Sequence, residues 1–84
     1  MADKIKILLA EDERMLSEIL CDTLRDRDFE VVAAYDGEEA LDKVRATSFD
    51  VVVTDVMMPR MDGISAMVKI REKSNVPVIL LTAK

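Results

Sequence analysis

A short run of β-branched residues that ends in a carboxylate constrains this chain more than any other stretch. Residues 51–54 read Val-Val-Val-Thr, and Asp55 follows them. Because the run has no polar alternation, it is typical of a strand that is buried on both faces of a parallel sheet. Pro59 cannot continue a strand and disfavours helix at Met58, so a loop must come next. We therefore expect Asp55 to be exposed at the end of a rigid strand and not packed inside the sheet.

Three other short apolar runs have the same character. They cover residues 5–10, 30–35 and 76–82, and each is too short for a helix. Pro77 lies near the start of the last run, where a strand tolerates proline. With residues 51–55, these runs predict four strands.

The segments between the strands carry apolar residues at helical spacing. Asp12, Asp36 and Asp62 stand where a carboxylate can cap the start of such a helix. Asp36 and Glu39 are three residues apart, as in a capping box. The residues expected on the inner faces are Met15, Leu16, Ile19, Leu20 and Leu24, then Ala40, Leu41 and Val44, then Ile64, Met67, Val68 and Ile70.

The predicted order of elements is therefore βαβαβαβ in a single small α/β domain over residues 1–84. Strands that alternate with helices in this way form a parallel sheet through right-handed crossovers. No linker, low-complexity tract or repeat interrupts the pattern.

Composition and charge exclude several classes of function. The net charge of -5 argues against a surface in these residues that binds nucleic acid or an anionic membrane, because phosphates would be repelled. No apolar run approaches the ~18 residues of a membrane span. Cys21 is the only cysteine, so no internal disulfide can form, and it is expected to be a buried, inert thiol. We interpret the chain as a soluble cytoplasmic protein.

Acidic side chains follow two of the predicted strands. Glu11 and Asp12 come after the first, Asp55 ends the third, and Thr82 ends the fourth. Parallel strands end at one edge of the sheet, so these groups are expected to lie together. Carboxylates this close repel one another unless a cation lies among them. Neither strand end carries a lysine or arginine, and oxygen ligands without histidine or thiol suit Mg²⁺.

With such an ion in place, Asp55 has a plausible chemical task. A carboxylate can attack a phosphoryl group and form an aspartyl phosphate. The metal would neutralise the phosphoryl oxygens, and the Thr82 hydroxyl would position one of them. Taken alone, Thr82 is better interpreted as an ordinary β-branched strand residue.

Taken together, these residues resemble a known family, the receiver domain of two-component response regulators. The resemblance covers the whole chain and rests on Glu11-Asp12, on Asp55 followed by Met58-Pro59 and Asp62-Gly63, and on Leu81-Thr82-Ala83. It implies a flavodoxin-like, doubly wound parallel sheet with strand order 2-1-3-4.

The resemblance also implies a function. It makes Asp55 the phosphoacceptor for a sensor histidine kinase, so the chain is a phosphorylatable signalling module and not an enzyme with turnover. It implies that Glu11, Asp12, Asp55 and the backbone carbonyl of Met57 surround Mg²⁺. Thr82 becomes the switch hydroxyl that moves toward the phosphoryl group.

The family pattern continues past residue 84, with a fifth strand, a lysine before a proline and two more helices. Lys84 is not that lysine, because it follows the fourth strand directly. We therefore interpret residues 1–84 as a partial, C-terminally truncated receiver. The fourth strand would then be an apolar sheet edge that invites a second chain. The alternative function is accordingly a truncated or engineered fragment that does not signal and that self-associates or swaps elements into a homo-oligomer.

Other classes fit less well. A phosphatase or mutase with an aspartate nucleophile usually has a second aspartate two residues on, where this chain has Met57. A flavin or nucleotide binder needs a glycine- or hydroxyl-rich loop after the first strand, where Glu11-Asp12-Glu13 would repel a phosphate. Met57, Met58 and Met61 suggest adaptable packing more than a soft-metal site.

Overall fold

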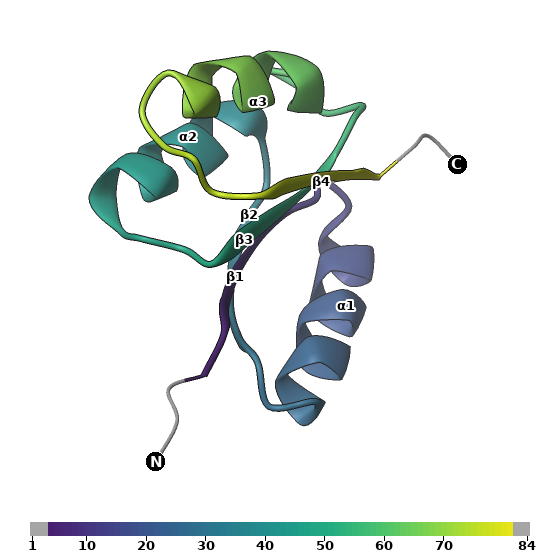
Figure 1. Ribbon diagram of the computed structural model, residues 1–84. Coiled ribbons are helices and arrows are strands. Elements are labelled where there is room, and N and C mark those ends of the chain that lie inside the picture. The colour runs from purple at the N-terminus through teal and green to yellow at the C-terminus, as the bar shows by residue number, and fades with distance from the viewer. Residues whose placement is uncertain (1–3, 82–84) are drawn as a thin grey trace.

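The computed structural model describes residues 4–81, which form four strands and three helices in strict alternation (Figure 1). Each expected element is present, with bounds that differ from the sequence-based ranges by a few residues. The elements are β1 (Lys6–Ala10), α1 (Arg14–Asp26), β2 (Glu30–Ala34), α2 (Gly37–Ala46), β3 (Val51–Asp55), α3 (Gly63–Arg71) and β4 (Val78–Leu81).

The four strands form one parallel sheet in the order β2-β1-β3-β4. Helix α1 covers one face of the sheet, and α2 and α3 cover the other (Figure 1). The helices lie on opposite faces because right-handed crossovers run outward from β1 in one direction and then return past it in the other. This confirms the predicted doubly wound α/β fold with order 2-1-3-4. Within residues 4–81, none of the helices combines the length and apolar character that a membrane span requires.

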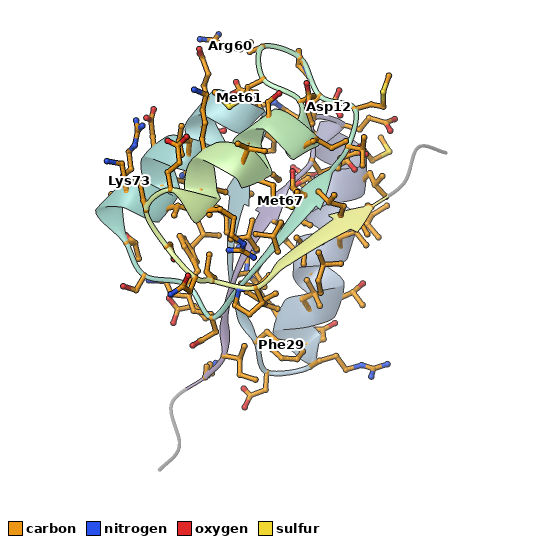
Figure 2. All side chains as sticks on the ribbon, turned by 45° about the horizontal axis from the view of Figure 1, so that its top comes forward. Asp12, Phe29, Arg60, Met61, Met67 and Lys73 are labelled. Carbon is orange, nitrogen blue, oxygen red and sulfur yellow. The ribbon has the colours of Figure 1, made fainter. Side chains whose placement is uncertain are left out.

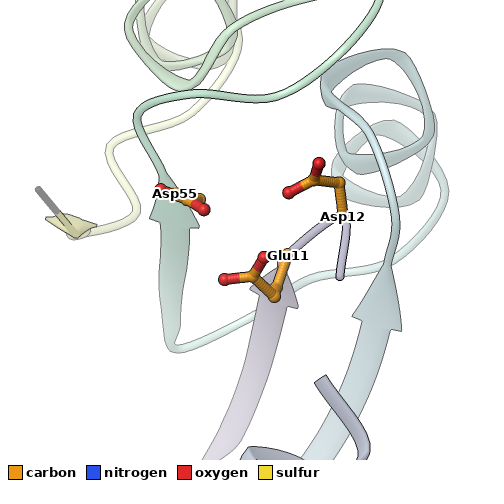
Figure 3. Close-up of side chains that lie close together, drawn as sticks. All are labelled: Glu11, Asp12 and Asp55. Carbon is orange, nitrogen blue, oxygen red and sulfur yellow. The ribbon is translucent and has the colours of Figure 1, made fainter. Parts of the chain in front are cut away.

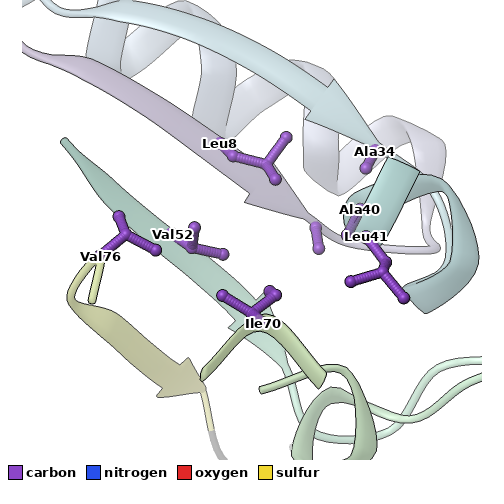
Figure 4. Packing of buried hydrophobic residues seen from close by; sticks show 8 residues of the cluster. Leu8, Ala34, Ala40, Leu41, Val52, Ile70 and Val76 are labelled. Carbon is purple, nitrogen blue, oxygen red and sulfur yellow. The ribbon is translucent and has the colours of Figure 1, made fainter. Parts of the chain in front are cut away.

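Strand β1 supplies both halves of the core. Its Leu8 and Ala10 join a cluster beneath α2 and α3, while Ile7 and Leu9 join a second cluster beneath α1. Alternate residues of a strand point to opposite faces, so a strand covered on both sides has to be apolar throughout. Figure 4 shows the first cluster, which consists of Leu8, Ala10, Ala34, Ala40, Leu41, Val52, Ile70 and Val76.

The inner face of α1 differs from the predicted one. Ser17 and Cys21 are its buried residues, which confirms the buried thiol. Met15 and Ile19 were expected to be inside, but they are 77% and 56% exposed. The prediction was wrong because α1 packs mainly on β2 and β1. That contact centres the helix on Ser17 and Cys21 and turns one flank of the apolar stripe to solvent.

Helix α3 is also rotated relative to its predicted inner face. Ala66 and Ile70 are buried, whereas Ile64 and Val68 are about half exposed. Apolar residues occupy most positions of this helix, so its periodicity does not distinguish the two faces. The inner face of α2 is as expected, with Ala40 and Leu41 buried and Val44 packed against them.

Two of the three predicted helix caps are present. The Asp36 carboxylate accepts a hydrogen bond from the Glu39 N–H at 2.8 Å, and Asp62 accepts one from the Ser65 N–H at 2.8 Å. The Glu39 carboxylate in turn accepts a hydrogen bond from the N–H of Tyr35, one residue before the cap. The Ser65 N–H bond lowers the pKa of Asp62, so this cap is present above the ordinary carboxyl pKa and is lost as the pH falls through the lowered one.

The third predicted cap is wrong. Helix α1 has Glu13 at its N-cap position, and no side-chain cap hydrogen bond is made there. The Glu13 N–H instead donates to the Glu11 carboxylate at 3.0 Å. Asp12 lies instead in the acidic cluster described below.

We expect Asp36→Ala to lower the free energy of unfolding by about 1 kcal/mol, because it removes the side-chain acceptor at the start of α2. Urea unfolding followed by circular dichroism measures this change. Asp42→Ala, an exposed substitution inside the same helix, is the control. Equal stabilities of the two variants would contradict the role of the cap.

Candidate functional site

The register between β1 and β3 brings the acidic residues together. Ala10 pairs with Thr54, so the residues that follow them, Glu11 and Asp55, lie side by side at the edge of the sheet. Asp12 comes one residue later. One carboxylate oxygen from each of these three residues lies within 4.8 Å of the other two, and Figure 3 shows the side chains turned toward a shared space.

The site is more enclosed than the sequence indicated. Asp55 and Glu11 are each 1% exposed, and Asp12 is partly buried. The prediction that Asp55 stands exposed at the sheet edge was therefore wrong. The reason is the loop after β3, which does not lead away from the strand end. It returns across it, and Gly63 lies against the main chain of Asp55.

Main-chain hydrogen bonds hold both strand ends in place. The Val56 N–H donates to the Leu81 carbonyl at 3.1 Å, which continues the pairing of β3 with β4 past Asp55. The Gly63 N–H donates to the Val56 carbonyl at 2.9 Å and closes the loop at its neck. On the other side, the Glu11 N–H donates to the Ala34 carbonyl at 3.0 Å. The acidic groups are thus carried on a fixed backbone.

Gly63 contributes to this site in a way that the Asp62-Gly63 motif by itself did not indicate. A Cβ at this position would lie 2.1 Å from the Asp55 carbonyl oxygen and 3.1 Å from the Val56 Cα. No glycine in the described chain has a positive φ, so glycine is needed here for space and not for backbone freedom. The sequence did carry a signal for this role. Glycine is unfavourable inside a helix, yet it stands here directly after a capping aspartate.

Two arginines in neighbouring segments make contacts with residues outside the acidic cluster. Arg14, at the start of α1, lies with its guanidinium 3.9 Å from the centre of the Tyr35 ring, a cation–π contact. Arg60, in the loop after β3, pairs with Glu38 at 3.0 Å, and this hydrogen bond and charge raise the pKa of Arg60.

The donor set of the cluster fits magnesium. Mg²⁺ binds oxygen ligands at about 2.1 Å, so two ligands on opposite sides of the ion are about 4.2 Å apart. The 4.8 Å spread of the three carboxylate oxygens is close to this span. Small side-chain movements or intervening waters would complete the coordination, and Mg²⁺ commonly retains waters.

The predicted roles of the other two site residues, Met57 and Thr82, are not tested by the structure. Met57 follows Asp55 by two residues in the loop, with its side chain exposed, and the role of its carbonyl stays a prediction. Thr82 lies outside the described residues. Leu81, the residue before it, is the register partner of Asp55.

Solved structures with the same fold include several receivers. The response regulator TrrA of Thermotoga maritima, determined in complex with Mg²⁺-BeF, matches with a TM-score of 0.89 and 36% identity, over 95% of this chain and 70% of that one. The chemotaxis protein CheY4 of Vibrio cholerae matches with a TM-score of 0.93 and 34% identity, over 98% of this chain and 71% of that one.

Sequence comparisons agree with the structural ones. The transcriptional regulatory protein CpxR of Escherichia coli is 43% identical over 79 residues, which is 94% of this chain and 34% of CpxR. The chain thus spans about a third of the length of this curated relative. The family model of the response regulator receiver domain matches residues 7–84 of this chain. With the predicted motifs, the fold and the acidic cluster in agreement, this chain belongs to the response regulator receiver domain family.

Proposed function

We propose that the chain is the phosphoacceptor module of a two-component response regulator and that Asp55 receives the phosphoryl group from a sensor histidine kinase. The observation that carries the proposal is the convergence of Glu11, Asp12 and Asp55 within 4.8 Å at the carboxyl ends of β1 and β3. Parallel α/β sheets bind their ligands at this edge.

The transfer is a substitution at phosphorus. A carboxylate oxygen of Asp55 attacks the phosphorus of the phosphohistidine and forms a P–O bond, while the P–N bond breaks and the imidazole leaves with its electron pair. Because β3 and the loop neck hold Asp55 in place, the nucleophile is oriented before the donor arrives. Burial of Asp55 also limits access of water to the acyl phosphate that forms.

We propose Glu11, Asp12, Asp55 and the Met57 carbonyl as the magnesium ligands. When bound, the ion supplies positive charge that offsets the phosphoryl oxygens and the acidic cluster. The oxygen-only donor set supports this assignment, as does the Mg²⁺-BeF complex of the similar receiver TrrA. The Thr82 hydroxyl is proposed to hold one phosphoryl oxygen.

The chain acts in this proposal as a cytoplasmic signalling module without turnover. Its partner is a histidine kinase, and it makes no direct contact with nucleic acid because its net charge is -5. CpxR is a transcriptional regulatory protein. Since the chain spans a third of it, any output function would belong to other segments.

Incubation with acetyl phosphate and Mg²⁺ is expected to add about 80 Da to the intact protein, the mass of one phosphoryl group. Asp55→Asn removes the nucleophile and should abolish the gain, whereas the exposed control Asp42→Asn should retain it. Intact mass spectrometry measures both. A gain of the same size in Asp55→Asn would refute Asp55 as the acceptor.

Mg²⁺ is expected to raise the unfolding temperature of the wild type, because a ligand that binds only the folded state stabilises it by about 2.7 kcal/mol at a hundred times its Kd. Asp12→Asn removes one ligand charge and should largely suppress this rise. Thermal unfolding by circular dichroism, with K⁺ at matched ionic strength as control, measures the effect. Equal rises in the two proteins would exclude Asp12 as a ligand.

We further propose that these residues, on their own, associate into a homo-oligomer. Over residues 4–81, β4 is an edge of the sheet with Ile79 half exposed. Met15 and Ile19 add apolar surface on α1. Apolar edge strands pair readily with a second chain, so a second copy could extend the sheet. This association is the alternative to a monomeric signalling module. In that alternative the chain is a fragment that does not signal.

Ile79→Lys should shift the chain toward the monomer, because a charge on the exposed face of an edge strand opposes pairing. Sedimentation velocity at several concentrations measures the distribution. Val68→Lys places the same charge on the half-exposed surface of α3 and serves as the matched control. A wild type that is monomeric at every concentration would end this proposal.

A further inference from the structure

The start of α2 lies in close contact with the loop that follows Asp55. Gly37, the first residue of α2, is buried against Met61. A Cβ on Gly37 would lie 2.1 Å from the Met61 carbonyl oxygen and 2.7 Å from the Met61 Cβ. Real Cβ atoms do not approach other atoms so closely, and the carbonyl belongs to backbone that cannot rotate away as a side chain can. The two segments meet because position 37 carries no side chain.

Helix propensity alone does not explain this glycine. Gly37 lies in a helix, where alanine is normally more favourable, and its φ is not positive. At such a position Gly→Ala normally stabilises a protein, because alanine loses less chain entropy on folding. The contact with Met61 reverses that expectation. Gly37, like Gly63, is required for space.

Arg60 reinforces the contact from the loop side. Its φ is 71°, in the left-handed region that favours glycine. Its guanidinium donates to the Glu38 carboxylate at 3.0 and 3.2 Å and lies 3.6 Å from that of Asp36. Figure 2 shows Arg60 and Met61 at the end of the molecule that carries Asp12. Because Arg60 and Glu38 are 65% and 50% exposed, their ion pair adds little, and the backbone contact dominates.

The loop can transmit a displacement to the site. Its neck is closed by the hydrogen bond from Gly63 to Val56, and Gly63 in turn touches the Asp55 carbonyl. Within the loop, the Met61 N–H donates to the Pro59 carbonyl at 2.8 Å, which tightens the turn. A side chain at position 37 would have to push this closed loop outward. Such a displacement would bear on the neck, because Gly63 follows Met61 by two residues.

We propose that Gly37 is a positioning residue of the acidic site: by admitting the Met61 carbonyl against the start of α2, it sets the position of the loop that carries the Met57 carbonyl and ends against the Asp55 main chain. Gly37 does not touch the reacting groups, and it acts only through the loop. The inference rests on the proposed function, because the role it assigns is to place ligands for Mg²⁺.

The test is the Mg²⁺ affinity of folded protein, measured by titration and followed by the amide resonances of Asp55 and Gly63. Gly37→Ala should bind Mg²⁺ about tenfold more weakly than the wild type, the size of effect seen when groups that orient metal ligands are altered. Val44→Ala is the matched control. It loosens the packing of the same helix about two turns beyond Gly37 and should keep the wild-type affinity.

Arg60→Gly separates the steric contact from the ion pair. It removes the charge but suits the left-handed backbone, so its affinity should stay within about twofold of the wild type, as for a surface ion pair of little energy. A larger loss in Arg60→Gly than in Gly37→Ala would overturn the assignment to Gly37. So would a Gly37→Ala protein that is folded and binds Mg²⁺ as the wild type does.

If Gly37→Ala does not fold, Gly37→Ala/Met61→Gly is compared with Met61→Gly, because removing the Met61 Cβ leaves only the carbonyl contact. The double variant should bind Mg²⁺ more weakly than Met61→Gly, and equal affinities would reject the inference. If the wild type itself fails to bind Mg²⁺, the proposed magnesium site fails, and the positioning role assigned to Gly37 falls with it.

Discussion

The parallel pairing of β1 with β3 is the constraint on which the rest of this molecule depends. It aligns Ala10 with Thr54, so that Glu11 and Asp55 follow at the same level of the sheet. Because side chains alternate along a strand, a slip of one residue would turn Asp55 to the opposite face and place Thr54 or Val56 beside Glu11. The apolar pattern of β1, which serves a core cluster on each face, opposes such a slip. The register that builds the core therefore also builds the acidic site.

The loop after β3 has the second decisive role. Asp55 is buried because this loop folds back over the strand end and is closed by the hydrogen bond between Gly63 and Val56. Gly37 and Gly63 allow the backbone segments to approach, each from a different helix. Neither residue contributes a functional group, yet both lie where a single methyl group would displace the loop. The site is therefore built from close backbone contacts at these two positions as well as from the carboxylates.

Much of the fold follows from local pattern. Short β-branched runs and helical spacing predict the βαβαβαβ order, and Asp36 and Asp62 cap their helices as expected. The inner faces were predicted less well. Met15, Ile19, Ile64 and Val68 are apolar residues at helical spacing, yet they are exposed. Apolar spacing identifies a helix, but which side of a mostly apolar helix is buried depends on what lies against it.

The sequence by itself determined which chemistry is available. It places oxygen ligands at the ends of two strands, and one of them is the Asp55 carboxylate at the end of a buried strand. These are local properties, set by residue type and by the periods of strand and helix. Only the tertiary structure decided that Glu11, Asp12 and Asp55 converge within 4.8 Å, that Asp55 is covered, and that Gly37 contacts Met61. Each of these depends on segments that are distant along the chain, and the packing of the sheet and helices sets the distance between such segments.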